Sequence, residues 1–255
     1  MFSSTNFQVC KVFGVPVKAD ISLILIAGML VHSYVGSASF GAALVAGLLA
    51  TASLLLALFV HEVGHALAAL HFSSRVYEIT LMFFGGYAKM SDLPSDPLKR
   101  AAISLAGPAA GLLLWFLAPI AAGLPAMPRF LAFMLGAAAH FSIALSVFNL
   151  IPALPLDGGL ALRDIVANFK GRAFATFLSA RLSFGIAVAM GLYGLLFARS
   201  IFLVFIAFFV WSAAKTELAR SAAGEDDPDI LDDDIVVISP PPYGKEKEYT
   251  RKRRG

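Results

Sequence analysis

One long apolar stretch decides the class of fold. Residues 41–72 read GAALVAGLLATASLLLALFVHEVGHALAALHF, and no charged side chain occurs in its first twenty positions, 41–60. A helix that crosses the hydrocarbon core of a bilayer, about 30 Å thick, needs roughly 20 predominantly apolar residues. This stretch exceeds that requirement, so it predicts a transmembrane helix.

The rest of the chain has the composition of a membrane protein. Of its 255 residues, 58% are hydrophobic and 15% are charged, and the mean hydropathy is +0.78. Soluble domains carry about 25% charged residues, so this composition excludes a disordered chain, a nucleic-acid-binding module and an ordinary cytosolic enzyme. The candidate spans are residues 21–36, 41–72, 101–123, 130–151, 182–198 and 200–214. We predict an all-α polytopic membrane protein with about six transmembrane helices.

The basic residues predict how the chain is oriented in the lipid bilayer. With the N-terminus inside, only Arg129 and Arg199 fall in outer turns. The inner segments hold Lys11, Lys18, Arg75, Lys89, Lys99, Arg100, Arg163, Lys170, Arg172, Arg181, Lys215 and Arg220. Cytoplasmic loops carry an excess of Lys and Arg. We therefore expect both termini to be cytoplasmic.

Two segments outside the spans have a distinct composition. Residues 77–90 are rich in β-branched and aromatic side chains around Gly85 and Gly86, which predicts a short membrane-associated hairpin. Residues 221–255 contain an acidic run from Glu225 to Asp234 and a basic end, which predicts a disordered cytoplasmic tail. The chain thus divides into a membrane domain, 1–220, and the tail, 221–255.

A metal-binding pattern lies inside the second apolar stretch. His61-Glu62-Val63-Gly64-His65 is an H-E-x-x-H motif. On a helix, the two histidines lie one turn apart on one face and can bind one zinc ion, while the glutamate reaches a water molecule on the metal. Two hydrogen-bonded structural histidines are the plainer interpretation. It leaves Glu62 unexplained, because an ionisable group inside a span is costly.

A catalytic zinc site needs a third protein ligand. His32, His71, His140 and Asp157 are the candidates. Asp157 lies in the segment 149–159, NLIPALPLDGG, where the two prolines prevent a regular helix and the two glycines allow close approach of backbone. Broken helices at membrane depth occur where they face protein or a water-filled cavity. Taken alone, Asp157 is best interpreted as the N-cap of a following helix, 159–168. The histidine pair of the H-E-x-x-H motif reverses this preference and favours Asp157 as the third ligand.

These motifs give the chain a specific resemblance. It resembles the site-2 protease family of intramembrane zinc metalloproteases over residues 11–220. Besides H-E-x-x-H and residues 149–159, the matching pieces are Gly14-Val15-Pro16-Val17, Gly85-Gly86 and Ala106-Gly107-Pro108. The family often has Asn at the position of Gly111, so this chain departs from the pattern at one substrate-side or supporting contact.

The resemblance implies roles for five residues. It assigns one Zn²⁺ to His61, His65 and Asp157, makes Glu62 the general base, and makes Asn149 a hydrogen-bond donor near the scissile carbonyl. The implied activity is hydrolysis of a peptide bond in or near the transmembrane span of a membrane protein, in regulated intramembrane proteolysis. The implied substrate is a single-span regulatory protein, and the implied location is a prokaryotic cytoplasmic membrane, where a membrane partner could regulate access. Asn149 could instead cap a helix end before Pro152.

Two other classes of function fit parts of the pattern. An intramembrane zinc transporter or sensor also uses His and Asp ligands, although a transporter usually has several polar residues along a path. A catalytically inactive membrane scaffold is the third reading, and retention of Glu62 argues against it. Glu62→Gln separates these readings, because only a protease needs the carboxylate for turnover.

Overall fold

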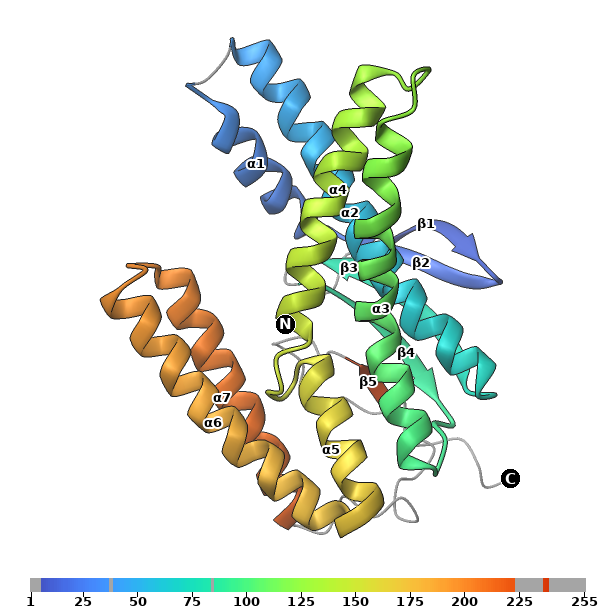
Figure 1. Cartoon of the computed structure of the whole chain (residues 1–255), viewed down its shortest axis with the longest axis vertical. Helices are drawn as coiled ribbons and strands as arrows, with labels where there is room; N and C mark the ends of the chain where they lie inside the picture. Colours follow the sequence, from blue (N-terminus) through green and yellow to red (C-terminus); the bar gives the residue numbers. More distant parts are fainter. Residues whose placement is uncertain (1–5, 37–38, 84, 223–235, 239–255) are drawn as a thin grey trace.

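A computed structural model describes residues 6–36, 39–83, 85–222 and 236–238. Seven helices and five strands occur in these ranges (Figure 1). In chain order they are β1 (Asn6–Val12), β2 (Val15–Asp20), α1 (Leu23–Tyr34), α2 (Phe40–His71), β3 (Arg75–Met82), β4 (Gly85–Ser91), α3 (Pro97–Ala122), α4 (Arg129–Asn149), α5 (Asp157–Lys170), α6 (Arg172–Leu196), α7 (Ile201–Ala222) and β5 (Val236–Ile238).

Five of the helices are long and apolar enough to cross a membrane. Within the described ranges these are α2, α3, α4, α6 and α7, and each corresponds to one of the spans predicted from hydropathy. The chain is therefore an integral membrane protein, as the composition predicted. Its longest helix, α2, has 32 residues and carries the H-E-x-x-H motif.

The first predicted span differs from the prediction. Residues 23–34 form α1, a helix of 12 residues, which is about 18 Å long and shorter than the hydrocarbon core. It packs on the first half of α2, where Gly47 lies so close to Val31 that an added Cβ would overlap that residue's backbone. The first of the six predicted spans is thus a short helix paired with α2, and five full-length spans remain among the described residues.

The predicted hairpin is confirmed and belongs to a larger sheet. β3 and β4 pair antiparallel, and the strand order is β1-β2-β3-β4-β5. β1 and β2 form a second hairpin through Phe13 and Gly14, both with positive φ, as a tight two-residue turn requires. β2 then pairs parallel with β3, and Lys18 forms an ion pair with Glu78 across this pair that raises the Lys18 pKa.

Two apolar cores hold the elements together. The larger lies between the sheet and helices α1, α2 and α3, and its buried members include Val17, Leu58, Ile79, Met90 and Ile103. The smaller joins the segment between α4 and α5 to α6 and α7 through Ala153, Leu156, Ala187 and Val210. In Figure 1, α6 and α7 lie together beside α5, away from the sheet.

The predicted break in the helix before Asp157 is confirmed. α4 ends at Asn149 and α5 begins at Asp157. The intervening backbone is tied to α6, because Leu154 N–H donates to Ser183 Oγ at 2.8 Å. Gly158 and Gly159 lie in α5 with ordinary helical φ, so the close approach alone explains them: an added Cβ would overlap the backbone of residues 150–151 and 153–154.

The tail contains one described element. Residues 236–238 form β5, which pairs antiparallel with β4, although a disordered tail was predicted for this segment. The signal for it is the run Ile235-Val236-Val237-Ile238, because β-branched side chains favour strands. The remaining residues of the predicted tail after Ala222 lie outside the described residues.

Candidate metal centre

The H-E-x-x-H motif lies on the second half of α2, as predicted. His61, Glu62 and His65 are all buried, at 3%, 4% and 1% exposure. The helical spacing of four residues places the two imidazole rings beside each other, with centroids 4.9 Å apart. α2 presents this face to α3, because Gly64 packs against the Ala106 carbonyl and the Ala110 side chain.

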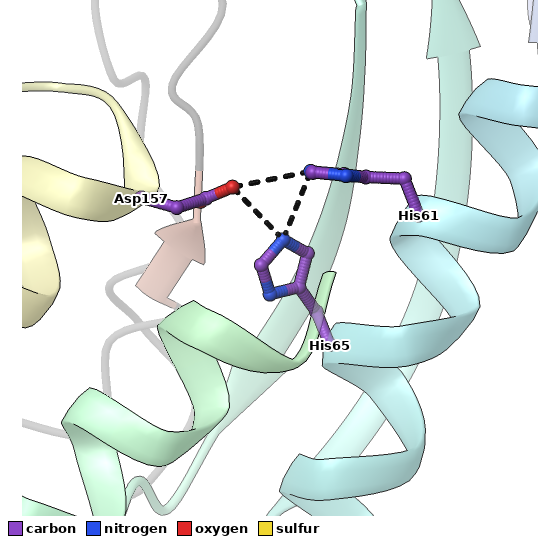
Figure 2. Close-up of side chains that lie close together, drawn as sticks. All are labelled: His61, His65 and Asp157. Atoms are coloured by element: carbon purple, nitrogen blue, oxygen red, sulfur yellow. Dashed lines mark hydrogen bonds and ion pairs between the residues drawn. The ribbon is translucent and has the colours of Figure 1, made fainter. Parts of the chain in front are cut away.

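Asp157 reaches the two histidines from the first residue of α5. Its side chain is completely buried, and the N-cap position of α5 is Leu156. Oδ2 of Asp157 faces the histidines and Oδ1 bonds no backbone N–H. The carboxylate therefore does not act as the helix cap that the sequence left open. Figure 2 shows it pointing across the gap between α5 and α2 toward His61 and His65.

The three donor atoms form a compact triangle. Nε2 of His61 lies 3.1 Å from Oδ2 of Asp157 and 3.3 Å from Nε2 of His65. The third edge, from His65 Nε2 to Asp157 Oδ2, measures 3.4 Å (Figure 2). Tetrahedral zinc with ligands at about 2.0–2.1 Å places neighbouring ligand atoms about 3.3 Å apart. The spacing of these donors therefore fits one zinc ion.

The proton positions support the same fit. Nδ1 of His65 lies 2.8 Å from the Ile103 carbonyl oxygen, and a carbonyl only accepts, so Nδ1 must donate. In the neutral ring, Nε2 then directs its lone pair at the other two donor atoms. Asp157 Oδ1 and His61 Nδ1 have no hydrogen-bond partner among the described residues. A cation at the centre of the triangle would offset the repulsion between the lone pairs of the two Nε2 atoms and Asp157 Oδ2, which converge there.

Glu62 lies beside the triangle and against the sheet. An added Cβ at Gly86 of β4 would come within 2.6 Å of Glu62 Cγ, 2.7 Å of Oε1 and 2.8 Å of Cδ. Gly86 therefore leaves the space that the Glu62 carboxylate occupies. The start of β4 forms one wall of the site.

A second glycine makes room for His65. A Cβ at Gly107 of α3 would overlap the imidazole ring of His65 at Nε2, Cε1 and Cδ2. Gly107 and the Ile103 carbonyl thus define the position and the proton state of this ring. The sequence flagged Gly86 and Gly107 through the resemblance but gave no reason for either. The Ile103 carbonyl was missed, since any residue type supplies one.

Asn149 lies at the end of α4, with 9% exposure. Its side-chain nitrogen donates to the Leu145 carbonyl at 3.0 Å, one turn back within α4. The amide nitrogen carries two N–H groups, so this contact leaves the second one to donate elsewhere. The predicted contribution of Asn149 to chemistry stays a prediction.

The other candidate ligands lie elsewhere. His140 donates to the Gly136 carbonyl at 2.7 Å and is exposed, His71 packs edge-on against Phe72, and His32 lies in α1. Among the described residues, the one group of His, Cys, Asp or Glu donors able to hold a metal is His61, His65 and Asp157. An added Cβ at Gly111 would come within 2.3 Å of Ser146 Oγ on α4, so a larger side chain at position 111 would require Ser146 to move.

The fold and this centre define a polytopic membrane protein with a buried His-His-Asp metal site and an adjacent glutamate. The profile of Peptidase family M50 matches residues 49–130 and 124–192, more than half of the chain. These matches contain the motif helix and the Asp157 segment. The chain belongs to peptidase family M50.

Individual relatives agree with this assignment. A Synechocystis relative is 34% identical over 205 residues, covering 76% of this chain and 54% of the relative. A zinc metalloprotease of Methanocaldococcus jannaschii is 28% identical over 221 residues, covering 83% of this chain and 60% of its own length. The chain thus spans a little more than half the length of these two relatives.

A solved structure shows the same fold. The site-2 protease from Methanocaldococcus jannaschii aligns with a TM-score of 0.58 and 26% identity, covering 84% of this chain and 95% of that one. The site-2 protease-like fold predicted from the motifs is therefore confirmed, and the His-His-Asp centre is consistent with one Zn²⁺.

Proposed function

We propose that this chain is a zinc-dependent intramembrane endopeptidase of the site-2 protease type. The observation that carries the proposal is the buried carboxylate of Glu62, which lies next to three metal-ligating donors inside a helix long enough to span the bilayer. A zinc site with a purely structural role needs no such carboxylate. Peptide hydrolysis does, because a base must take a proton from water.

His61, His65 and Asp157 would hold the zinc ion. Their three donors leave a fourth position open, as catalytic zinc sites do. When bound, zinc supplies a Lewis acid that polarises a carbonyl and lowers the pKa of water to about 7.

Glu62 would carry the proton. Its carboxylate, set between the histidine pair and the Gly86 backbone, accepts a proton from the attacking water and returns it to the departing amide nitrogen. Asn149 would donate to the developing oxyanion through the N–H that does not bond the Leu145 carbonyl. Removing a donor of this kind typically costs about 3 kcal/mol of transition-state stabilisation.

The substrate would be a membrane protein whose span unwinds at the site. Because a helical peptide bond is shielded, we propose that the substrate pairs as an extended strand with the hairpin. Positions 79–81 of β3 are paired on both sides, with β2 and β4. Within the described ranges, β4 pairs with β5 only at Ala88–Met90, so the edge suited to strand addition is that of β4, beginning at 85–87 beside the Glu62 wall.

The cellular setting follows from the same reading. We propose single-span regulatory proteins as substrates, a prokaryotic cytoplasmic membrane as the location, and cytoplasmic termini, with cleavage in the cytosolic half of the substrate span. Five full-length spans are compatible with this orientation because β2 pairs with β3. We propose that β1 and β2 begin on the side of the β3–β4 hairpin and that α1 leads the chain back to the start of α2. The enrichment of Lys and Arg in the inner loops supports this orientation. Residues 1–220 would form the protease domain, residues 221–255 a cytoplasmic tail, and a membrane partner could regulate the enzyme.

Glu62→Gln tests the proposal. The variant should keep its zinc while the rate of cleavage of a model single-span substrate falls by roughly 10²–10⁴-fold, since the amide cannot act as a base. Glu78→Gln, a change of the same type on β3, is the matched control and should cleave like the wild type. Turnover that persists in Glu62→Gln would contradict the role of Glu62. Zinc flux into sealed vesicles without any cleavage would favour the transporter reading.

A further inference from the structure

The chain covers the edge of its own hairpin. β5 pairs antiparallel with β4, with Ala88 opposite Ile238, Lys89 opposite Val237 and Met90 opposite Val236. β2 covers the other side of the hairpin through its parallel pairing with β3. Across the described ranges, β2 covers one edge of the β3–β4 hairpin at 79–81 and β5 covers the other at 88–90. Each edge is therefore paired over three positions, one of them by a segment that follows the last membrane helix.

The covered edge borders the candidate metal centre. β4 begins at Gly85, and Gly86 lies against the Glu62 side chain. Ala88, the position paired with Ile238, is two residues further along the same strand, which is about 7 Å at the rise of a β-strand. In the view of Figure 1, β5 is drawn between β4 and the start of α5, the helix that carries Asp157.

We propose that residues 236–238 occupy the position of a substrate strand and act as an internal competitor. This inference rests on the proposed function, because it assumes that a substrate pairs with β4. Strand addition uses main-chain hydrogen bonds, and one strand edge offers a single row of these groups. The tail and a substrate strand that pairs along the whole of β4 therefore exclude each other at Ala88–Met90.

The sequence around β5 suits this role. Residues 235–238 are four β-branched apolar residues in a row, which favour an extended conformation. Residues 223–235 connect them to the end of α7. A connection of this length gives an effective concentration in the millimolar range, so pairing with a dissociation constant below that range keeps the edge covered until a substrate displaces it.

Disulfide trapping tests the register of the pairing. Cys10 is the only cysteine and is exposed, so Cys10→Ser provides the background. Lys89→Cys with Val237→Cys joins two opposed positions and should form a disulfide readily, since opposed Cα atoms lie within the range that a disulfide spans. Lys89→Cys with Ile238→Cys is the matched control and should react more slowly. Equal trapping in both pairs, or trapping between two copies of the chain, would overturn the proposal.

Binding of a model peptide tests the competition without requiring catalysis. The probe is a synthetic Lys-flanked peptide with about 20 Leu and Ala residues, added to full-length Glu62→Gln protein in detergent. The disulfide formed in Lys89→Cys with Val237→Cys holds β5 on β4 and should weaken peptide binding about tenfold. A reductant should restore the affinity. Equal affinity in the locked and reduced protein would overturn the competitor role.

Freeing the edge should have the opposite effect. In Val236→Pro with Val237→Pro, one of the two successive prolines removes an N–H that faces β4. The KM of a cleaved single-span substrate should fall about tenfold while kcat stays unchanged, and Val236→Thr with Val237→Thr should behave like the wild type. An unchanged KM, with cleavage still abolished by Glu62→Gln, contradicts this inference alone. Peptide binding that responds to the disulfide without any wild-type cleavage contradicts the proposed function instead.

Discussion

The two parts of the molecule that meet at the metal centre are held together in different ways. α2, which supplies His61, Glu62 and His65, is surrounded by the sheet, α1, α3 and α4 in the larger core. The segment just before α5, which leads into Asp157, is joined to α6 and α7 by a small apolar cluster. α5 itself packs against α3 and α6 and is linked to its surroundings by partly buried ion pairs. These link Arg100 to Asp164 at 3.2 Å and Arg163 to Glu217.

This difference indicates which part of the site is rigid. The histidine pair is fixed by backbone contacts, namely the Ile103 carbonyl and the close approach of Gly107. Asp157 depends on the placement of a whole helix that begins directly after a break in the chain. A metal ion bound by all three residues would therefore join the two parts, and its loss should loosen α5 more than α2.

The largest effect is expected at Gly107, whose bare backbone leaves room for the His65 ring. Gly107→Val places a side chain in the volume of the His65 ring, so zinc affinity should fall by about 100-fold or more. A zinc titration against a competing chelator measures this. Gly136→Val, at a helical glycine with open space around it, should leave the affinity unchanged. Wild-type affinity in Gly107→Val would show that the histidine pair is not held as described.

Gly86→Ala should impair catalysis without affecting zinc binding. Its Cβ would displace the Glu62 carboxylate, and a displacement of about 1 Å in a catalytic group can cost roughly 100-fold in rate. Cleavage should fall by that order while zinc content stays at the wild-type level. Gly185→Ala, which meets no atom within 4 Å, serves as the control. Loss of zinc in Gly86→Ala would mean that the sheet supports the metal ligands as well.

The smallest effect is expected at the join between α3 and α5. Asp164→Asn leaves the Arg100 guanidinium without its buried carboxylate, although Arg100 keeps contacts to the Pro94 and Ser95 carbonyls. The free energy of unfolding in detergent should fall by about 2 kcal/mol. Asp96→Asn, at the N-cap of α3, should change it little, because Asn caps a helix as well as Asp. Equal stability of the two variants would show that the ion pair between Arg100 and Asp164 does not stabilise the contact between α3 and α5.

What the sequence could predict depends on the range of the interaction. The helical spacing of His61 and His65 and the break before Asp157 are local patterns, and both were correct. Gly86 contacts Glu62 because glycine has no Cβ. The two residues lie on different elements, and no local sequence pattern predicts that they meet. β1 and β2 were missed for a similar reason, since strands are stabilised by partners that hydropathy does not reveal. β5 was missed although the β-branched run 235–238 favours a strand. Hydropathy alone also could not show that the first apolar segment ends too early to span.

The central claim is that donors from the two parts of the molecule converge on one zinc ion. Zinc content per chain of the purified protein, compared between wild type and Asp157→Ala, tests this directly. We expect about one zinc per wild-type chain, and loss or strong weakening of binding in the variant, because two histidines alone make an incomplete site. A well-folded wild type that holds no zinc after purification without chelator, or Asp157→Ala protein with wild-type affinity, would contradict the account.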